Sequence, residues 1–134
     1  MVDDVAINKA AIIERCIARV REEHGGDPRS LTADQRRQDS IVLNLQRACE
    51  AAIDLAMHRV RTQALGVPQE SRHAFELVRD AGRVPVDVAE AMIRMVGFRN
   101  VAVHDYRRLD LAIVERIVTA HLDDFLAFAH AALR

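Results

Sequence analysis

The sequence predicts an all-α fold, an antiparallel helical bundle of four long helices and one short helix. Apolar residues recur at helical spacing throughout, and no segment shows the strict alternation that is typical of a strand. Half of the 134 residues are apolar, which is enough to form a hydrophobic core. We therefore expect a single helical domain over 1–134, because this length is typical of one domain.

The first long helix is expected over about 4–24. Gly25 and Gly26 follow it directly, and glycine is a common helix terminator. The next stretch, GGDPRS, consists largely of turn-forming residues and is expected to be a loop. The apolar positions of this helix are Ile7, Ala11, Ile13, Ile17 and Val20.

The second long helix is expected to begin at a capping box formed by Thr32 and Gln35. It would continue to about Leu65, because Gly66 and Pro68 then interrupt the helical pattern. Its inward face is rich in alanine and contains Ile41, Leu45, Ala48, Ala52, Leu55 and Ala56.

Three more helices are expected in the rest of the chain. A short helix over 71–81 would end at Gly82 and direct Phe75 and Val78 inward. Pro85 suits the start of the fourth helix, since proline is favoured in the first turn. That helix carries Val88, Met92, Ile93 and Val96. Asp110 can cap one last long helix, which bears Ile113, Val114, Ile117, Val118, Leu122, Phe125 and Leu126.

Cysteine content and terminal composition indicate the compartment. Cys16 and Cys49 are far apart and lie in apolar helical patterns, which favours free buried thiols over a zinc site or a disulfide. The N-terminus lacks the pattern of a signal peptide, and no uncharged apolar run approaches the roughly 20 residues of a membrane span. We therefore expect a cytoplasmic protein without a membrane segment.

The apolar surface predicts self-association. The last helix and the alanine-rich second helix carry more apolar surface than one bundle core needs, and large apolar patches are rarely left facing water. A homodimer is expected, although a thick core within one chain would produce the same pattern. The net charge of −1 does not by itself indicate a nucleic-acid-binding protein, so such a role would need a local basic patch.

The segment GFRNVAVHDY, residues 97–106, concentrates polar side chains. Arg99 and His104 form an R-x4-H pattern, which is weak evidence alone because it recurs at Arg19/His24 and Arg116/His121. Asn100 and Tyr106, the only tyrosine, distinguish this copy. On an ideal helix Arg99 and His104 lie about 140° apart, so they converge only if the helix loosens or a second subunit contributes.

Arginine and histidine together suit cleavage of RNA without a metal or a cofactor. RNA supplies its own nucleophile, the 2′-OH, and a histidine with a pKa of about 6.5 can transfer the proton at neutral pH. The Arg99 guanidinium can bind the phosphate and stabilise its growing charge, while Asn100 can orient either group. The segment is locally basic and could contact RNA through Arg94, Arg107 and Arg108.

A structural role for the same residues is the alternative, and the spacing alone favours it. Arg99 would then pair with Asp105 or with a helix C-terminus, and His104 would be hydrogen-bonded in the core. Tyr106 would be a core ring with a satisfied hydroxyl.

The run RNVAVHDY resembles the R-x4-H-x-Y signature of the HEPN superfamily, and specifically of the HepT-like toxins. The resemblance extends over most of the chain, through its size, its helical order and the stretch FELVRDAGRVP before the motif. It implies a homodimeric, metal-independent endoribonuclease toxin in which Arg99 and His104 are catalytic and face a shared cleft. It also implies that Asn100 is the usual polar residue after the arginine. Tyr106 would be the tyrosine that an MNT-type nucleotidyltransferase antitoxin modifies with AMP.

Other polar residues have simpler explanations. A stripe on the second helix, formed by Glu50, Asp54, His58 and Arg61, could bind a metal, but a solvated face with pairs four residues apart is the more common arrangement. His121 is expected to be partly buried and hydrogen-bonded, His130 is expected to be exposed, and His73 has no evident partner.

Three functions therefore compete. The first is a ribonuclease toxin that is neutralised by a nucleotidyltransferase. The second is a non-catalytic helical partner or regulatory subunit of a nucleotidyltransferase, in which Arg99 and His104 bind a nucleotide phosphate. The third is a plain dimerisation module. Cleavage of RNA in the presence of a metal chelator separates the first function from the other two.

Overall fold

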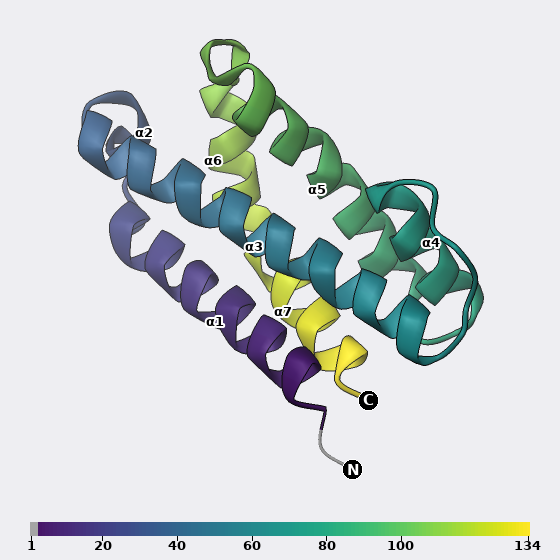
Figure 1. Cartoon of the computed structure of the whole chain (residues 1–134). Helices are drawn as coiled ribbons and strands as arrows, with labels where there is room; N and C mark the ends of the chain where they lie inside the picture. Colours follow the sequence, from purple (N-terminus) through teal and green to yellow (C-terminus); the bar gives the residue numbers. More distant parts are fainter. Residues whose placement is uncertain (1–2) are drawn as a thin grey trace.

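The computed structural model describes residues 3–134 and confirms the all-α prediction, with no strand in this range (Figure 1). The elements are α1 (Asp4–His24), α2 (Arg29–Thr32), α3 (Gln35–Thr62), α4 (Ser71–Asp80), α5 (Val86–His104), the 3₁₀-helix η1 (Tyr106–Arg108), α6 (Leu111–Ala120) and α7 (Leu122–Ala132). The prediction of one short and four long helices is therefore wrong in number, because α2 was not expected and the last helix is divided.

Four helices form the body of the bundle. Figure 1 shows α1, α3, α5 and α7 side by side with alternating chain direction, and α1 and α3 form the most extensive helix pair. The short α4 packs against α3 and α5. Every α-helix contributes to one hydrophobic core, whereas η1 contributes no buried residue. At one end of it the rings of Phe75 and Phe128 meet edge to face, with centroids 5.2 Å apart.

The first helix begins and ends as its sequence indicates. The Asp3 carboxylate accepts a hydrogen bond from the backbone amide of Ala6 at 3.0 Å, which caps an otherwise unpaired donor. Gly25 ends the helix in the left-handed conformation, with φ of 57°. The expected apolar face is largely buried, but Ile7 is 49% exposed and Ala11 is half-buried.

The predicted capping box at Thr32 is wrong. Residues 29–32 form α2, whose first amide donates to the Asp27 carboxylate at 3.0 Å and whose Leu31 is buried. Thr32 therefore ends a helix rather than starting one. Asp34 is the cap of α3 instead, and its Oδ1 accepts from the amide of Arg37 at 3.2 Å.

The last predicted helix is divided at His121. This residue leaves the helical conformation, with φ of −126° and ψ of 4°, and its Nδ1 lies 3.0 Å from Asp124 Oδ2. The break lets α7 bury Phe125 in the core while α6 turns away and leaves Ile113 52% exposed. No glycine or proline marks the site, so the apolar pattern predicted one continuous helix.

The two cysteines are free and buried, as expected. Burial raises the pKa of both thiols, so the reactive thiolate is disfavoured. No helix within residues 3–134 has the length and apolar character needed to cross a membrane.

Candidate active site at the end of α5

The R-x4-H-x-Y motif spans the last turns of α5 and η1. The helix continues unbroken to His104, where the amide of Asp105 still donates to the carbonyl of Val101 at 2.9 Å. Asn100 and His104 therefore lie one turn apart on the same face. Arg99 and Tyr106 do not share the face that a longer helix would give them, because the helix ends between them. Helical geometry keeps Arg99 and His104 about 140° apart.

The Arg99 guanidinium is held by two neighbouring helices. Nη1 lies 3.3 Å from Glu50 Oε1 on α3, and Nη2 donates to Ser71 Oγ on α4 at 3.2 Å. Its Nε–H is buried and has no acceptor among residues 3–134. Because Glu50 is its ionic partner, the expected structural pairing of Arg99 with Asp105 is wrong. The guanidinium is thus fixed in position and retains an unused donor.

His104 is exposed at the end of α5, so the expectation that it could be a core histidine is wrong. Its ring makes no hydrogen bond or ion pair with the described part of the chain, and none joins it to Arg99. The imidazole is therefore accessible to a ligand from solvent, and the two groups are not assembled against each other within one chain.

Tyr106 lies in η1 and is 42% exposed, so it is not a core ring. Its hydroxyl donates to Asp39 Oδ1 on α3 at 2.9 Å. Desolvation raises the pKa of Tyr106 to about 12, and the hydrogen bond and the charge of Asp39 act in the same direction. Sequence reasoning missed Asp39, which lies 67 residues away, because no local pattern connects it to the motif.

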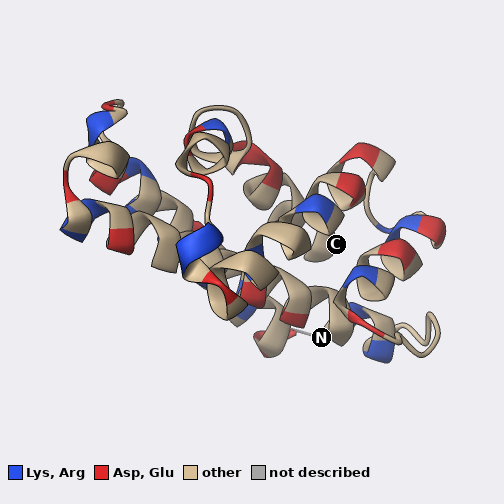
Figure 2. Cartoon of the chain, turned by 90° about the horizontal axis from the view of Figure 1, so that it is seen from above, with Lys and Arg blue, Asp and Glu red and all other residues tan. Residues whose placement is uncertain are grey.

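The arginines expected to bind RNA are exposed. Arg108 lies 3.7 Å from Asp105, a loose surface pair, and Arg94 and Arg107 also face solvent. Figure 2 shows that basic and acidic residues are interspersed along the helices.

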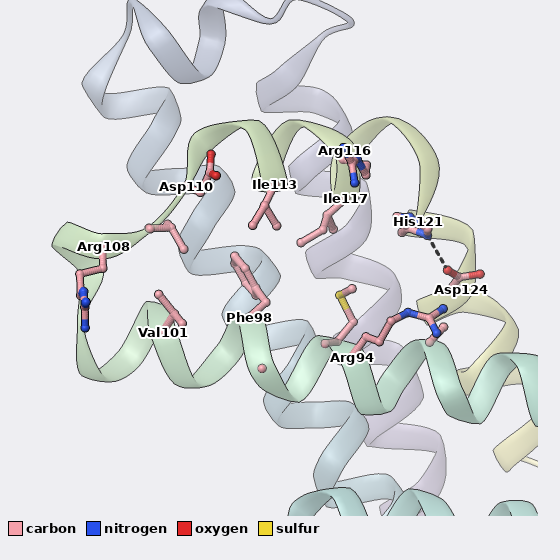
Figure 3. Close-up of a pocket in the computed structure, with 14 residues that line it drawn as sticks. Arg94, Phe98, Val101, Arg108, Asp110, Ile113, Arg116, Ile117, His121 and Asp124 are labelled. Atoms are coloured by element: carbon pink, nitrogen blue, oxygen red, sulfur yellow. Dashed lines mark hydrogen bonds and ion pairs between the residues drawn. The ribbon is translucent and has the colours of Figure 1, made fainter.

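An apolar groove of about 480 Å³ separates α5 from α6 beside the motif. Figure 3 shows Phe98 and Val101 directed into it from α5, and Ile113 and Ile117 directed into it from α6. Arginine side chains, including Arg108, lie at its margins. Part of the apolar surface that the sequence assigned to a partner therefore lies here, on α6, whereas the contribution of α5 was not predicted.

The polar stripe of α3 is neither a metal site nor a set of pairs along one helix. Glu50 contacts Arg99, Asp54 Oδ2 lies 3.0 Å from Lys9 Nζ, and the buried His58 lies 2.8 Å from Asp3. The expected pairing within the helix is therefore wrong for these three residues. No group of three or more candidate metal ligands occurs between residues 3 and 134.

The other two R-x4-H copies have structural contacts. His24 is buried and its Nε2 lies 2.8 Å from Glu115 of α6. His121 is partly buried and hydrogen-bonded, as expected, and His130 is exposed, as expected. His73 does have a partner, because its Nδ1 accepts from the amide of Gln69 at 3.0 Å.

The chain matches a known protein family over most of its length. The profile of the family described as Ribonuclease HepT-like matches residues 13–132. The chain is 46% identical over 126 residues to mRNA nuclease HepT of Shewanella oneidensis, an alignment that covers 94% of each protein.

Solved structures extend the similarity to the whole fold. A tri-AMPylated Shewanella oneidensis HEPN toxin in complex with MNT antitoxin superposes with a TM-score of 0.91 at 45% identity, covering 97% of each chain. A toxin–antitoxin complex with AMP-PNP also gives a TM-score of 0.91, at 44% identity, covering 96% of this chain and 97% of the other.

Proposed function

We propose that this chain, because it belongs to the HepT-like ribonuclease family, is a toxin that cleaves RNA internally without a metal ion and is neutralised by a nucleotidyltransferase antitoxin. The observation that carries the proposal is the end of α5, where a fixed Arg99 guanidinium and an exposed His104 imidazole lie within one motif. We place this activity in the cytoplasm, where RNA and a partner enzyme meet.

The proposed cleavage uses the RNA 2′-OH as nucleophile. The His104 imidazole accepts its proton as the 2′-oxygen attacks the adjacent phosphorus and the bond to the 5′-oxygen breaks. The departing 5′-oxygen takes a proton from water. The products are a 2′,3′-cyclic phosphate and a 5′-OH end. Arg99 stabilises the charge that develops on the phosphate, and Asn100, one turn before His104, orients the imidazole or the phosphate. The RNA backbone on either side is bound by Arg94, Arg107 and Arg108.

The proposed active form is a homodimer. In one chain Arg99 is directed toward α3 and α4, while His104 is exposed at the end of α5, so the two groups do not form a closed site. A second copy that covers exposed apolar residues such as Val101 and Ile113 would bring two motifs to one cleft. Each phosphate would then meet groups from both chains.

The proposed control acts through Tyr106. Tyr106 is exposed, so a partner enzyme can reach it, and a related toxin has been solved in its tri-AMPylated form with MNT antitoxin. An AMP on Tyr106 would place a negatively charged phosphate and a nucleotide where RNA must bind. Nearby arginines would pair with that phosphate instead of with RNA, so inhibition requires no change of fold.

The test is expression in cells with and without the cognate nucleotidyltransferase gene. Wild-type chain alone should arrest growth, His104→Ala should not, and coexpression of the nucleotidyltransferase should restore growth. His130→Ala is the matched control, because it removes an exposed histidine from α7, away from the motif, and should stay toxic. Equal toxicity of His104→Ala and wild type would contradict the proposed function.

A further inference from the structure

We infer that Asp39 of the toxin accepts the Tyr106 proton during AMP transfer and is therefore a catalytic residue in the toxin's own neutralisation. This inference rests on the proposed function, in which Tyr106 is the modified residue. It assigns to α3 a chemical role that the motif alone does not indicate.

The contact between the two residues is direct. Tyr106 Oη donates to Asp39 Oδ1 at 2.9 Å, within the normal range for a hydroxyl hydrogen bond. Both residues are exposed, so a nucleotidyltransferase carrying ATP can approach the hydroxyl without displacing the core. Asp39 Oδ1 therefore already accepts a hydrogen bond from the hydroxyl proton that must leave.

The Asp39 carboxylate is also held in place from its own helix. The side-chain amide nitrogen of Gln35, Nε2, donates to the same Oδ1 at 2.8 Å and to Gln38 Oε1 at 2.7 Å. Gln35 thus contacts the carboxylate oxygen that faces Tyr106, and Gln38 holds Gln35. A proton acceptor that is already oriented loses less conformational freedom when the reaction begins.

No other described acid competes for the hydroxyl. Asp105 is adjacent in sequence, but its carboxylate lies 3.7 Å from the Arg108 guanidinium, and it makes no hydrogen bond to Tyr106. The phenol is protonated at neutral pH, since the ordinary pKa of tyrosine is 10.0, and desolvation and Asp39 raise the pKa of Tyr106 further. The proton must therefore be removed as the new bond forms, and general-base catalysis supplies that step.

AMP transfer moves the α-phosphoryl group of ATP from pyrophosphate to Tyr106 Oη. Tyr106 Oη attacks the α-phosphorus of ATP, and the Oη–phosphorus bond forms while the bond from the α-phosphorus to the bridging oxygen breaks. Pyrophosphate leaves with that electron pair, and the phenolic proton passes to Asp39 Oδ1. After Asp39 ionises again, its charge repels the new phosphodiester, which favours movement of the modified side chain away from α3.

The experiment measures AMP incorporation by intact-mass spectrometry, with full-length toxin, its cognate nucleotidyltransferase and ATP. Asp39→Asn retains an oxygen that accepts the hydrogen bond but cannot take the proton. Its rate for the first AMP should fall by about 10²–10⁴-fold, the usual contribution of a general base. Asp39→Glu retains a carboxylate and should recover part of the rate, which a purely structural role does not predict.

Asp105→Asn is the matched control, because it removes the same charge next to Tyr106 without touching its hydroxyl. It should be modified at the wild-type rate. Any second AMP must use another hydroxyl, since Tyr106 Oη is consumed, so its addition should be equally fast in Asp39→Asn and wild type.

Three results would count against the inference. Equal first-AMP rates in Asp39→Asn and wild type would overturn it while leaving the proposed function intact. An equal loss in Asp105→Asn would also overturn it, by showing that surface charge controls docking. A wild-type chain that takes no AMP on Tyr106 would overturn the modification as well as the role of Asp39.

Discussion

Tyr106 gives a direct spectroscopic measure of its contact with Asp39, because the chain has one tyrosine and no tryptophan. Ultraviolet absorbance should show ionisation with a pKa of about 12 in wild type and a lower value in Asp39→Asn. The shift should be partial, since desolvation remains its largest cause. The pKa of Tyr106 is higher in the folded chain than its ordinary value of 10.0. Protonated Tyr106 therefore stabilises the fold fully below pH 10.0, and this stabilisation is lost as the pH rises through about 12.

Circular dichroism at each pH checks that the chain remains folded during this titration. Asp105→Asn should leave the pKa of Tyr106 unchanged. If Asp39→Asn titrates as wild type does, the charge of Asp39 does not contribute to the raised pKa of Tyr106.

The fixed Arg99 guanidinium predicts that its shape is needed as well as its charge. In Arg99→Lys the planar group that contacts both Glu50 and Ser71 is replaced by a single ammonium. We expect RNA cleavage to slow by about 10²–10³-fold, as for loss of one transition-state donor. Arg19→Lys, in another R-x4-H copy, is the control and should cleave normally. Full activity of Arg99→Lys would exclude a specific role for the guanidinium.

At the scale of elements, the start of α3 allows a test of the observed cap, Asp34, against the predicted cap, Thr32. Asp34→Ala removes the acceptor of the Arg37 amide and should lower the free energy of unfolding by about 0.5–2 kcal/mol. Thr32→Ala should change it by less than about 0.5 kcal/mol, as expected for an exposed side chain that caps nothing. Urea unfolding of the three proteins measures both values, and the reverse order would restore Thr32 as the cap.

Helices were predictable where their ends carry local signals. Gly25 and Pro85 mark such ends, and both helix boundaries were found. The break at His121 has no local signal, because it depends on how α6 and α7 pack against the rest of the chain. The short helix α2 could not be predicted from the sequence for a related reason, because it is stabilised by burial of Leu31 against other helices.

The candidate site could likewise be predicted only in part. The motif residues lie close together in sequence and were identified from it, but their partners are distant along the chain. Glu50 and Ser71 approach Arg99, and Asp39 approaches Tyr106, only after α3, α4 and α5 have packed. A sequence pattern therefore gave the candidate reactive groups without the contacts that position them.

At the scale of the whole molecule, the groove between α5 and α6 predicts the dimer interface. Ile113→Glu places a charge on its exposed apolar margin and should convert the dimer to a 15.0 kDa monomer. RNA cleavage should be lost together with the dimer, because the proposed site needs two chains. Light scattering at micromolar concentration measures the mass.

Val67→Glu is the matched control for this substitution. Val67 is 76% exposed and lies between α3 and α4, away from the groove, so the variant should remain a fully active dimer. A wild-type monomer that cleaves RNA, or an active Ile113→Glu monomer, would exclude the shared cleft.

In the proposed mechanism, Arg99 and His104 promote metal-independent attack of the RNA 2′-OH on the adjacent phosphate. The most direct measurement is analysis of the RNA ends produced by purified wild type and His104→Ala in EDTA. Wild type should leave a 2′,3′-cyclic phosphate and a 5′-OH, and His104→Ala should be slower by about 10²–10⁴-fold. A 5′-phosphate end, a strict need for a divalent ion, or equal rates for the two proteins would contradict the mechanism.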